Sequence, residues 1–206
     1  MLLLRDIGFM QNGFDDAIST FMANIHNSFL NELMDMITHL GDNAIFWIII
    51  ALILVFSRRK RRGGVIMGIS LVLCLLVNNL LIKNTVGRNR PFMEHPEFYD
   101  LVFDVLVPPD SASFVSGHAC ASFAAATVVF LCFRDRKIYW ISGFVLATLI
   151  SLSRVYLLVH YFTDVLGGVI IGALLGIASY YLMKLFDLIW AKIKKQEVHE
   201  LFMYNE

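Results

Sequence analysis

This 206-residue sequence contains few prolines and cysteines, and its formal net charge is zero. Its four prolines all lie between residues 91 and 109, so the long apolar stretches elsewhere lack the residue that most often interrupts helices. The three cysteines, Cys74, Cys120 and Cys132, fall inside apolar stretches, which indicates neither a disulfide framework nor a metal site. The opening residues, MLLLRDIGF, lack a basic start, so we do not expect a cleaved signal peptide.

Hydrophobic residues make up 58% of the chain and gather in blocks, which is typical of a membrane protein. A helix needs about 20 apolar residues to cross a hydrocarbon core of about 30 Å. The sequence therefore predicts an all-α fold, a polytopic membrane helical bundle with about five transmembrane helices. The predicted spans are 41–57, 63–82, 115–133, 138–157 and 164–184.

Basic residues are distributed unevenly between the two ends of these spans. Twelve of the 17 lie in the segments 58–62, 134–137 and 184–195, which all fall at one end if the chain crosses five times. The positive-inside rule places that end in the cytoplasm. The opposite end holds the other five, which are Arg5, Lys83, Arg88, Arg90 and Arg154.

The spans divide the chain into three predicted parts. Residues 1–40 form an N-terminal amphipathic segment, in which apolar residues recur with helical spacing. This segment either lies at the outer membrane interface or packs on protein, and the sequence leaves both open. Residues 41–184 form the predicted transmembrane part, and residues 185–206 form a predicted cytoplasmic tail. A four-residue repeat of Gly168, Gly172 and Gly176 predicts close helix packing in the last span.

Three polar clusters occur at the predicted outer ends of the spans. They are KNTVGRNRP at residues 83–91, SFVSGHA at 113–119 and SRVYLLVHYFTD at 153–164. Three cations in them, Lys83, Arg90 and Arg154, would repel one another unless an anion binds, and guanidinium and ammonium groups both suit phosphate. The Ser116–Gly117–His118 turn adds backbone N–H groups at a helix N-terminus, where the helix dipole also favours an anion.

Two histidines in these clusters carry the predicted chemistry. His160 and Asp164 are four residues apart, so on a helix the carboxylate can orient the imidazole as a base or nucleophile. His118 is then free to protonate a leaving oxygen. These residues alone leave open which histidine attacks. Interface anchoring, a buried structural histidine and a zinc site are the alternatives, and zinc is disfavoured because three cations would repel it.

Together the clusters resemble the signature of the type 2 phosphatidic acid phosphatase superfamily, which also contains the vanadium haloperoxidases. That signature reads K-x6-RP, PSGH and SR-x5-H-x3-D, and the first and third parts match here throughout. Val115 stands where the family has proline, which is expected to loosen the approach to the turn. The resemblance implies that His160 forms a phosphohistidine, His118 protonates the leaving group and Asp164 holds His160. It further implies that Lys83, Arg90, Ser116, Gly117 and Arg154 bind the phosphate, with no metal and no cofactor.

The small size and outward-facing site look similar to bacterial undecaprenyl pyrophosphate phosphatases. We therefore expect an integral membrane lipid phosphatase at the extracytoplasmic face of the cell membrane. Phosphatidylglycerophosphate or phosphatidate is the alternative substrate, and a non-catalytic phospholipid binder or a haloperoxidase is less favoured. The expected partners are lipid phosphates and membrane lipids, without nucleic acid, and the sequence does not predict an oligomeric state.

Overall fold

Every regular element that the structure describes is a helix. The computed structural model describes residues 13–107 and 109–203, with the side chains of residues 103 and 196–203 left out. The predicted all-α bundle is therefore confirmed. The longer helices are α1 (Gly13–Asn24), α2 (Ser28–His39), α3 (Ile45–Phe56), α4 (Arg61–Leu75), α8 (Gly117–Cys132), α9 (Lys137–Tyr156) and α10 (Phe162–Met203).

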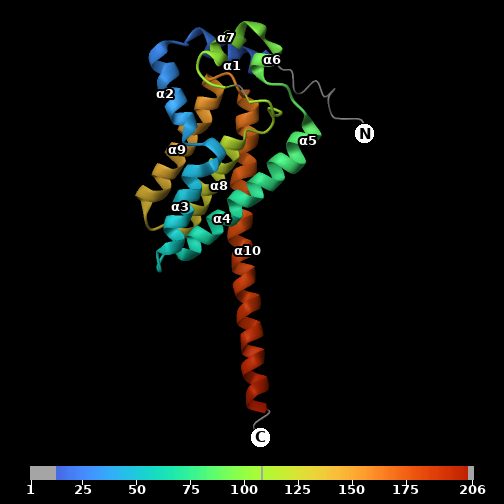
Figure 1. The fold of residues 1–206 in the computed structure, drawn as a ribbon. Coiled ribbons are helices and arrows are strands. Elements are labelled where there is room, and N and C mark those ends of the chain that lie inside the picture. The colour runs from blue at the N-terminus through green and yellow to red at the C-terminus, as the bar shows by residue number, and fades with distance from the viewer. Residues whose placement is uncertain (1–12, 108, 204–206) are drawn as a thin grey trace.

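Four helical stretches are long and apolar enough to cross a membrane: Ser28–Phe56, Arg61–Glu94, Lys137–Tyr156 and Phe162–Lys195. The remaining predicted span, 115–133, is the apolar helix α8, which at 16 residues is shorter. The last helix does not end near residue 184, because α10 continues through Met203 as one helix of 42 residues. The predicted tail is therefore its extension as far as the structure describes it (Figure 1).

The N-terminal segment forms two helices from Gly13 onward, and its first twelve residues lie outside the described part of the chain. Asn27 separates the two helices and caps α2, because its side chain accepts a hydrogen bond from the Leu30 amide at 3.0 Å. Helix α1 packs on α9 and α10, and α2 packs on α9. Phe14 and Phe29 remain exposed on these helices, so protein covers one face only.

Helix α8 lies at the centre of the bundle, in contact with α3, α4, α9 and α10. Its inward side chains are mostly small and fully buried, such as Ala124 and Ala125. Small residues let neighbouring backbones approach, and the glycine stripe of α10 is where this happens. A Cβ atom on Gly172 would lie 2.2 Å from the carbonyl oxygen of Cys120, so the predicted close packing is present.

One end of the bundle is covered by the long connection between the second span and α8. It contains α5 (Lys83–Val86), α6 (Pro91–Glu94), the 3-10 helix η4 (Pro96–Phe98) and α7 (Tyr99–Phe103). Gly87 ends α5 in the left-handed conformation at φ 62°, which glycine adopts without strain. The chain then turns back over the bundle, so that Arg88 and Arg90 become buried.

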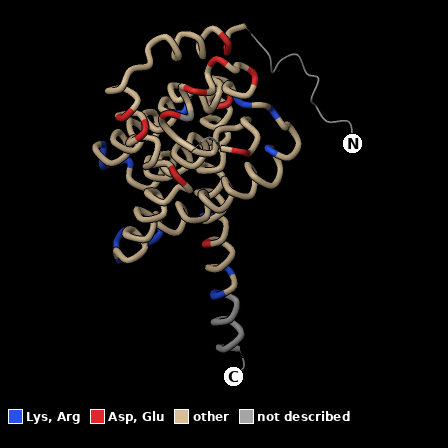
Figure 2. Tube along the Cα trace, turned by 45° about the horizontal axis from the view of Figure 1, so that its top comes forward, with Lys and Arg blue, Asp and Glu red and all other residues tan. Residues whose placement is uncertain are grey.

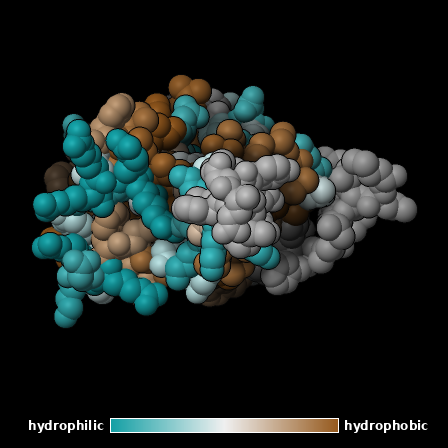
Figure 3. Space-filling model, turned by 90° about the horizontal axis from the view of Figure 1, so that it is seen from below, coloured by the Kyte–Doolittle hydropathy of each residue, from teal (hydrophilic) through white to brown (hydrophobic). Residues whose placement is uncertain are grey.

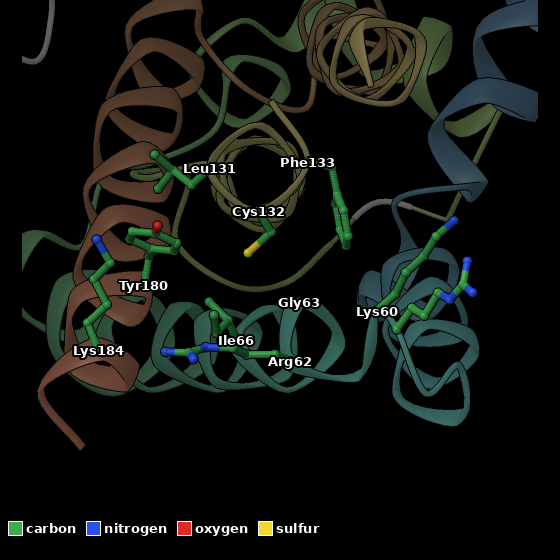
Figure 4. A pocket seen from close by; sticks show the side chains of 10 residues that line it. Lys60, Arg62, Gly63, Ile66, Leu131, Cys132, Phe133, Tyr180 and Lys184 are labelled. Carbon is green, nitrogen blue, oxygen red and sulfur yellow. The ribbon is translucent and has the colours of Figure 1, made fainter. Parts of the chain in front are cut away.

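The other end carries the basic connections. Figure 2 shows most acidic residues near the end with α1 and lysines and arginines at the α3–α4 turn, and Figure 3 shows hydrophilic side chains on that far face. A cavity of about 370 Å³ opens there between α4, the end of α8 and α10 (Figure 4). Arg59, Lys60, Arg62 and Lys184 line it, and Arg62 pairs with Asp187 of α10. The basic clusters thus share one end, as the positive-inside pattern predicts.

We expect Gly172→Ala to destabilise the bundle by about 1–3 kcal/mol, because the new methyl group would collide with the Cys120 carbonyl. Thermal unfolding in detergent measures this change. Gly68→Ala is the matched control, since a Cβ atom there would meet nothing within 4 Å. Equal melting temperatures for the two variants would contradict the close packing of α8 on α10.

Candidate active site

The three polar clusters predicted from the sequence lie at one end of the bundle, which also carries α1, α6 and α7 (Figure 1). Lys83 begins α5, directly after the π-helical segment η3 (Leu76–Ile82), and Arg90 precedes α6. Ser116 is the N-cap of α8. The third cluster runs from the last turn of α9 into the first turn of α10.

A contact between Arg90 and His160 joins the first and third clusters. Nη1 of Arg90 lies 3.3 Å from Nε2 of His160, and both side chains are buried. A guanidinium group can only donate, so this contact makes Nε2 the acceptor and assigns the ring proton to Nδ1. The lone pair of His160 therefore points at Arg90, where an anion held by that guanidinium would meet it.

Ser113 stands between His160 and Asp164. Nδ1 of His160 lies 3.7 Å from Oδ2 of Asp164, which is longer than a hydrogen bond, and 3.3 Å from Oγ of Ser113. The Ser113 hydroxyl donates to Asp164 Oδ2 at 2.5 Å. The direct hydrogen bond expected from the four-residue spacing is thus replaced by a bridge through serine, which still connects the carboxylate to the protonated side of the ring.

Arg88 holds the other side of Asp164. Its Nη1 donates to Oδ1 of Asp164 at 2.6 Å, and its Nη2 donates to Oδ2 of Asp15 in α1 at 2.8 Å. The Tyr161 amide donates to Oδ2 of Asp164 at 2.9 Å. All three charged groups are nearly excluded from solvent, so the ion cluster fixes Asp164 and ties the N-terminal helix to the site.

The other cations contact neutral oxygen atoms. Arg90 donates to the carbonyl of Val159 at 2.6 Å, Arg154 donates to the hydroxyl of Thr38 at 2.6 Å, and Lys83 donates to that of Ser111 at 3.0 Å. Among the described residues, the buried Nε of Arg154 has no hydrogen-bond partner within the protein. Positive charge at this end therefore exceeds the negative charge that contacts it, which suits an anionic ligand.

These cations also set the protonation of His160. Burial, followed by the charges of Arg90, Arg154 and Lys83, holds the pKa of His160 well below its ordinary value of 6.5. The ring is therefore neutral near pH 7, with its Nε2 lone pair available. In the described part of the chain, no three His, Cys, Asp or Glu side chains are grouped to hold a metal ion.

The Ser116–Gly117–His118 turn begins α8 beside this charge cluster. The Ser116 amide donates to the carbonyl of Asp164 at 3.1 Å, which fixes the turn against α10. The Ser116 hydroxyl is buried and has no partner among the described residues. Val115, in the place of the family's proline, is fully buried beside Gly167, where a Cβ atom would lie 2.9 Å from its Cγ1.

His118 contacts a carboxylate that the sequence analysis did not consider. Its Nε2 lies 3.1 Å from Oδ1 of Asp42, in the short 3-10 helix η2 (Asp42–Ala44) that joins α2 to α3. The second oxygen of Asp42 lies 2.7 Å from Nδ1 of His39. The His118 side chain is 17% exposed. Both histidines predicted to do the chemistry thus lie near a carboxylate.

Sequence reasoning missed Ser113, Arg88, Asp15 and Asp42. Their contacts with the site cross separations of 47 to 76 residues, so no helical spacing connects them. Two of them carried a signal, because Arg88 lies inside the first cluster, KNTVGRNRP, and Ser113 begins the second, SFVSGHA.

Comparison with known proteins identifies phosphatases as relatives of this chain. The PAP2 superfamily matches residues 63–187. The chain is 38% identical to phosphatidylglycerophosphatase B of Bacillus subtilis over 88% of this chain and 85% of that protein. It is 29% identical to an undecaprenyl-diphosphatase of Sulfolobus acidocaldarius, over 86% and 83%. The crystal structure of a transmembrane PAP2 type phosphatidylglycerolphosphate phosphatase from B. subtilis superposes with a TM-score of 0.66, at 32% identity, over 83% and 85%.

We expect Arg88→Met to destabilise the protein by about 3–5 kcal/mol, because it leaves the buried carboxylates of Asp15 and Asp164 without their shared cation. Thermal unfolding in detergent reports the change. Arg58→Met, at an exposed position, should stay within about 0.5 kcal/mol. Unfolding of the Arg88 variant at the wild-type temperature would show that the ion cluster does not hold the site together.

Proposed function

Because this chain belongs to the PAP2 superfamily, whose members here are membrane lipid phosphatases, we propose that it removes the terminal phosphate of a lipid through a phosphohistidine on His160. The contact of Arg90 with Nε2 of His160 carries the proposal, since it places a phosphate-binding group at the lone pair of a neutral imidazole. When a phosphate oxygen of the substrate binds the Arg90 guanidinium in place of Nε2 of His160, the phosphorus atom comes within reach of that nitrogen.

In the first step Nε2 of His160 attacks phosphorus, and the bond to the leaving oxygen breaks. His118 gives that oxygen a proton. Positive charge develops on the His160 ring, and Asp164 offsets it through Ser113. Lys83, Arg90 and Arg154 stabilise the negative charge on the transferring phosphoryl oxygens, together with the Ser116 hydroxyl and the N–H groups of the turn at Gly117.

In the second step water attacks the phosphohistidine. His118, now neutral, takes a proton from this water, and the bond between phosphorus and Nε2 breaks. Inorganic phosphate leaves, and both histidines return to their starting protonation. The three cations carry out the charge stabilisation that a metal ion supplies in other phosphoryl-transfer sites, and we therefore propose that the reaction needs no metal.

Two lipids fit this chemistry. Undecaprenyl pyrophosphate is the substrate favoured by the sequence, and a relative with that activity aligns over 86% of the chain. Phosphatidylglycerophosphate is supported by the higher identity, 38%, to a phosphatidylglycerophosphatase. The leaving group is a lipid phosphate in the first case and a glycerol alcohol in the second. The residues around the transferred phosphate serve both.

The test is phosphate release by the purified protein in detergent with EDTA present, from phosphatidylglycerophosphate, undecaprenyl pyrophosphate and phosphatidate. We expect release from at least one lipid, and loss of at least about 1000-fold in His160→Ala, because the attacking atom is gone. The phosphoenzyme should be trapped on His160 after an alkaline quench. Abolition of release by EDTA would overturn the metal-free mechanism. No release from any lipid would leave a phosphate binder as the better description, and vanadate-dependent bromide oxidation would indicate a haloperoxidase.

We further propose that the site faces the extracytoplasmic side of the cell membrane, since the basic connections lie at the other end. A membrane-impermeant maleimide added to intact cells should label a cysteine placed at Asp100, in α7 beside the site, and not one placed at Arg58. Both positions are exposed, and both should react after lysis. The reverse pattern would place the active site in the cytoplasm.

A further inference from the structure

A carboxylate outside the family's matched region contacts the proposed general acid. Asp42 precedes residues 63–187, and its Oδ1 lies 3.1 Å from Nε2 of His118. Its Oδ2 lies 2.7 Å from Nδ1 of His39, whose Nε2 is 3.4 Å from Asp35. Asp42 is thus held from both sides by imidazole groups.

The turn that carries Asp42 fits closely against the site. A Cβ atom on Gly41 would lie 2.4 Å from Cδ2 of His118, so only glycine lets the backbone approach this ring. Thr38, at the end of α2, accepts the hydrogen bond from Arg154. The segment 38–42 therefore touches both His118 and a phosphate-binding cation.

Two residues of this turn have a strained backbone conformation, which neighbouring contacts must hold in place. Asn43 and Ala44 follow Asp42 with φ values of 47° and 55°, and neither is glycine. The left-handed conformation is unfavourable for residues other than glycine and persists where surrounding contacts fix it. The two imidazole contacts of Asp42 are such contacts, and the strained turn in return aims the carboxylate at His118.

The charges around His118 make a carboxylate necessary for its proposed role. Arg154, which donates to Thr38 of the same segment at 2.6 Å, brings positive charge to this side of the site. Like charges disfavour the doubly protonated ring that a general acid must present. Asp42 opposes them, and by accepting from Nε2 it leaves Nδ1 as the nitrogen that can face the leaving oxygen.

We infer that Asp42 is the positioning residue of the general acid, holding the His118 ring in orientation and keeping it protonated until the bond between phosphorus and the leaving oxygen breaks. This inference rests on the proposed function. The proton moves from Nδ1 of His118 to the leaving oxygen and returns from the attacking water, while Nε2 keeps its proton and Asp42 stays ionised. His39 fixes the second oxygen of Asp42.

Substrates with different leaving groups test this role. An alkyl lipid phosphate needs its leaving oxygen protonated, whereas p-nitrophenyl phosphate releases a stable phenolate without a proton. For Asp42→Asn we expect kcat on the lipid to fall about 10- to 100-fold, and kcat on the aryl phosphate to change less than about threefold. The alkaline limb of kcat on the lipid should move to lower pH, because the protonated ring loses its counter-charge. Asp42→Glu should recover part of the loss.

Asp35→Asn is the matched control, since this carboxylate contacts His39 and not His118. Its activity should stay within about twofold of wild type on both substrates. Equal losses on both substrates in a folded Asp42→Asn protein, or no loss on either, would overturn the inference.

A readout without turnover separates this inference from the proposed function. In protein labelled with ¹⁵N at histidine, the His118 ring, assigned with His118→Gln, should stay doubly protonated to higher pH in wild type than in Asp42→Asn. Inactivity of the wild type on every phosphate would defeat the proposed function alone. Identical titration of His118 in the two proteins would defeat the inference about Asp42.

Discussion

Burial of positive charge at one end of the bundle is the constraint on which the site depends. Three arginines there, Arg88, Arg90 and Arg154, are less than a tenth exposed. A buried charge is tolerated only when it is paired and hydrogen-bonded. Arg88 meets this requirement fully through Asp15 and Asp164, whereas Arg90 and Arg154 meet only its second half, because they donate to neutral carbonyl and hydroxyl oxygens. The unmatched charge lies where the substrate phosphate is proposed to bind.

The pairing of Asp164 with Arg88 is consistent with a neutral His160, whose pKa is lowered first by burial and then by the nearby cations. A direct ion pair between Asp164 and His160 would favour the protonated ring, which cannot attack phosphorus. Instead Asp164 forms its ion pair with Arg88. Its link to Nδ1 of His160 runs through the hydroxyl of Ser113. His118 has the opposite arrangement, a closer carboxylate without such an arginine in the contacts described. His160 thus suits the role of a neutral nucleophile, and His118 suits the role of a proton donor.

The sequence predicted the site contacts between residues that are close along the chain. It did not predict the contacts between residues that only folding brings together. The separation of four residues between His160 and Asp164 predicted that they lie near each other, and the charge pattern predicted that three clusters meet at one end. The contacts of Arg88 and Asp42 with these clusters join residues 76 apart, which spacing rules cannot reach. Helices α3, α8 and α9 begin and end within four residues of the corresponding predicted spans. Helix α10 runs far beyond residue 184, because no proline or glycine after Gly176 marks an end to it.

The shortness of α8 has a consequence for which phosphates can reach the site. Sixteen residues at about 1.5 Å per residue give about 24 Å, less than the hydrocarbon thickness of about 30 Å. If its C-terminal end lies level with one headgroup plane of such a bilayer, its N-terminal turn lies several ångströms below the opposite one. A water-soluble ester would have to leave bulk solvent to descend into that recess. The phosphate of a lipid whose tails already lie in the bilayer would have to move inward only by the length of a few methylene groups.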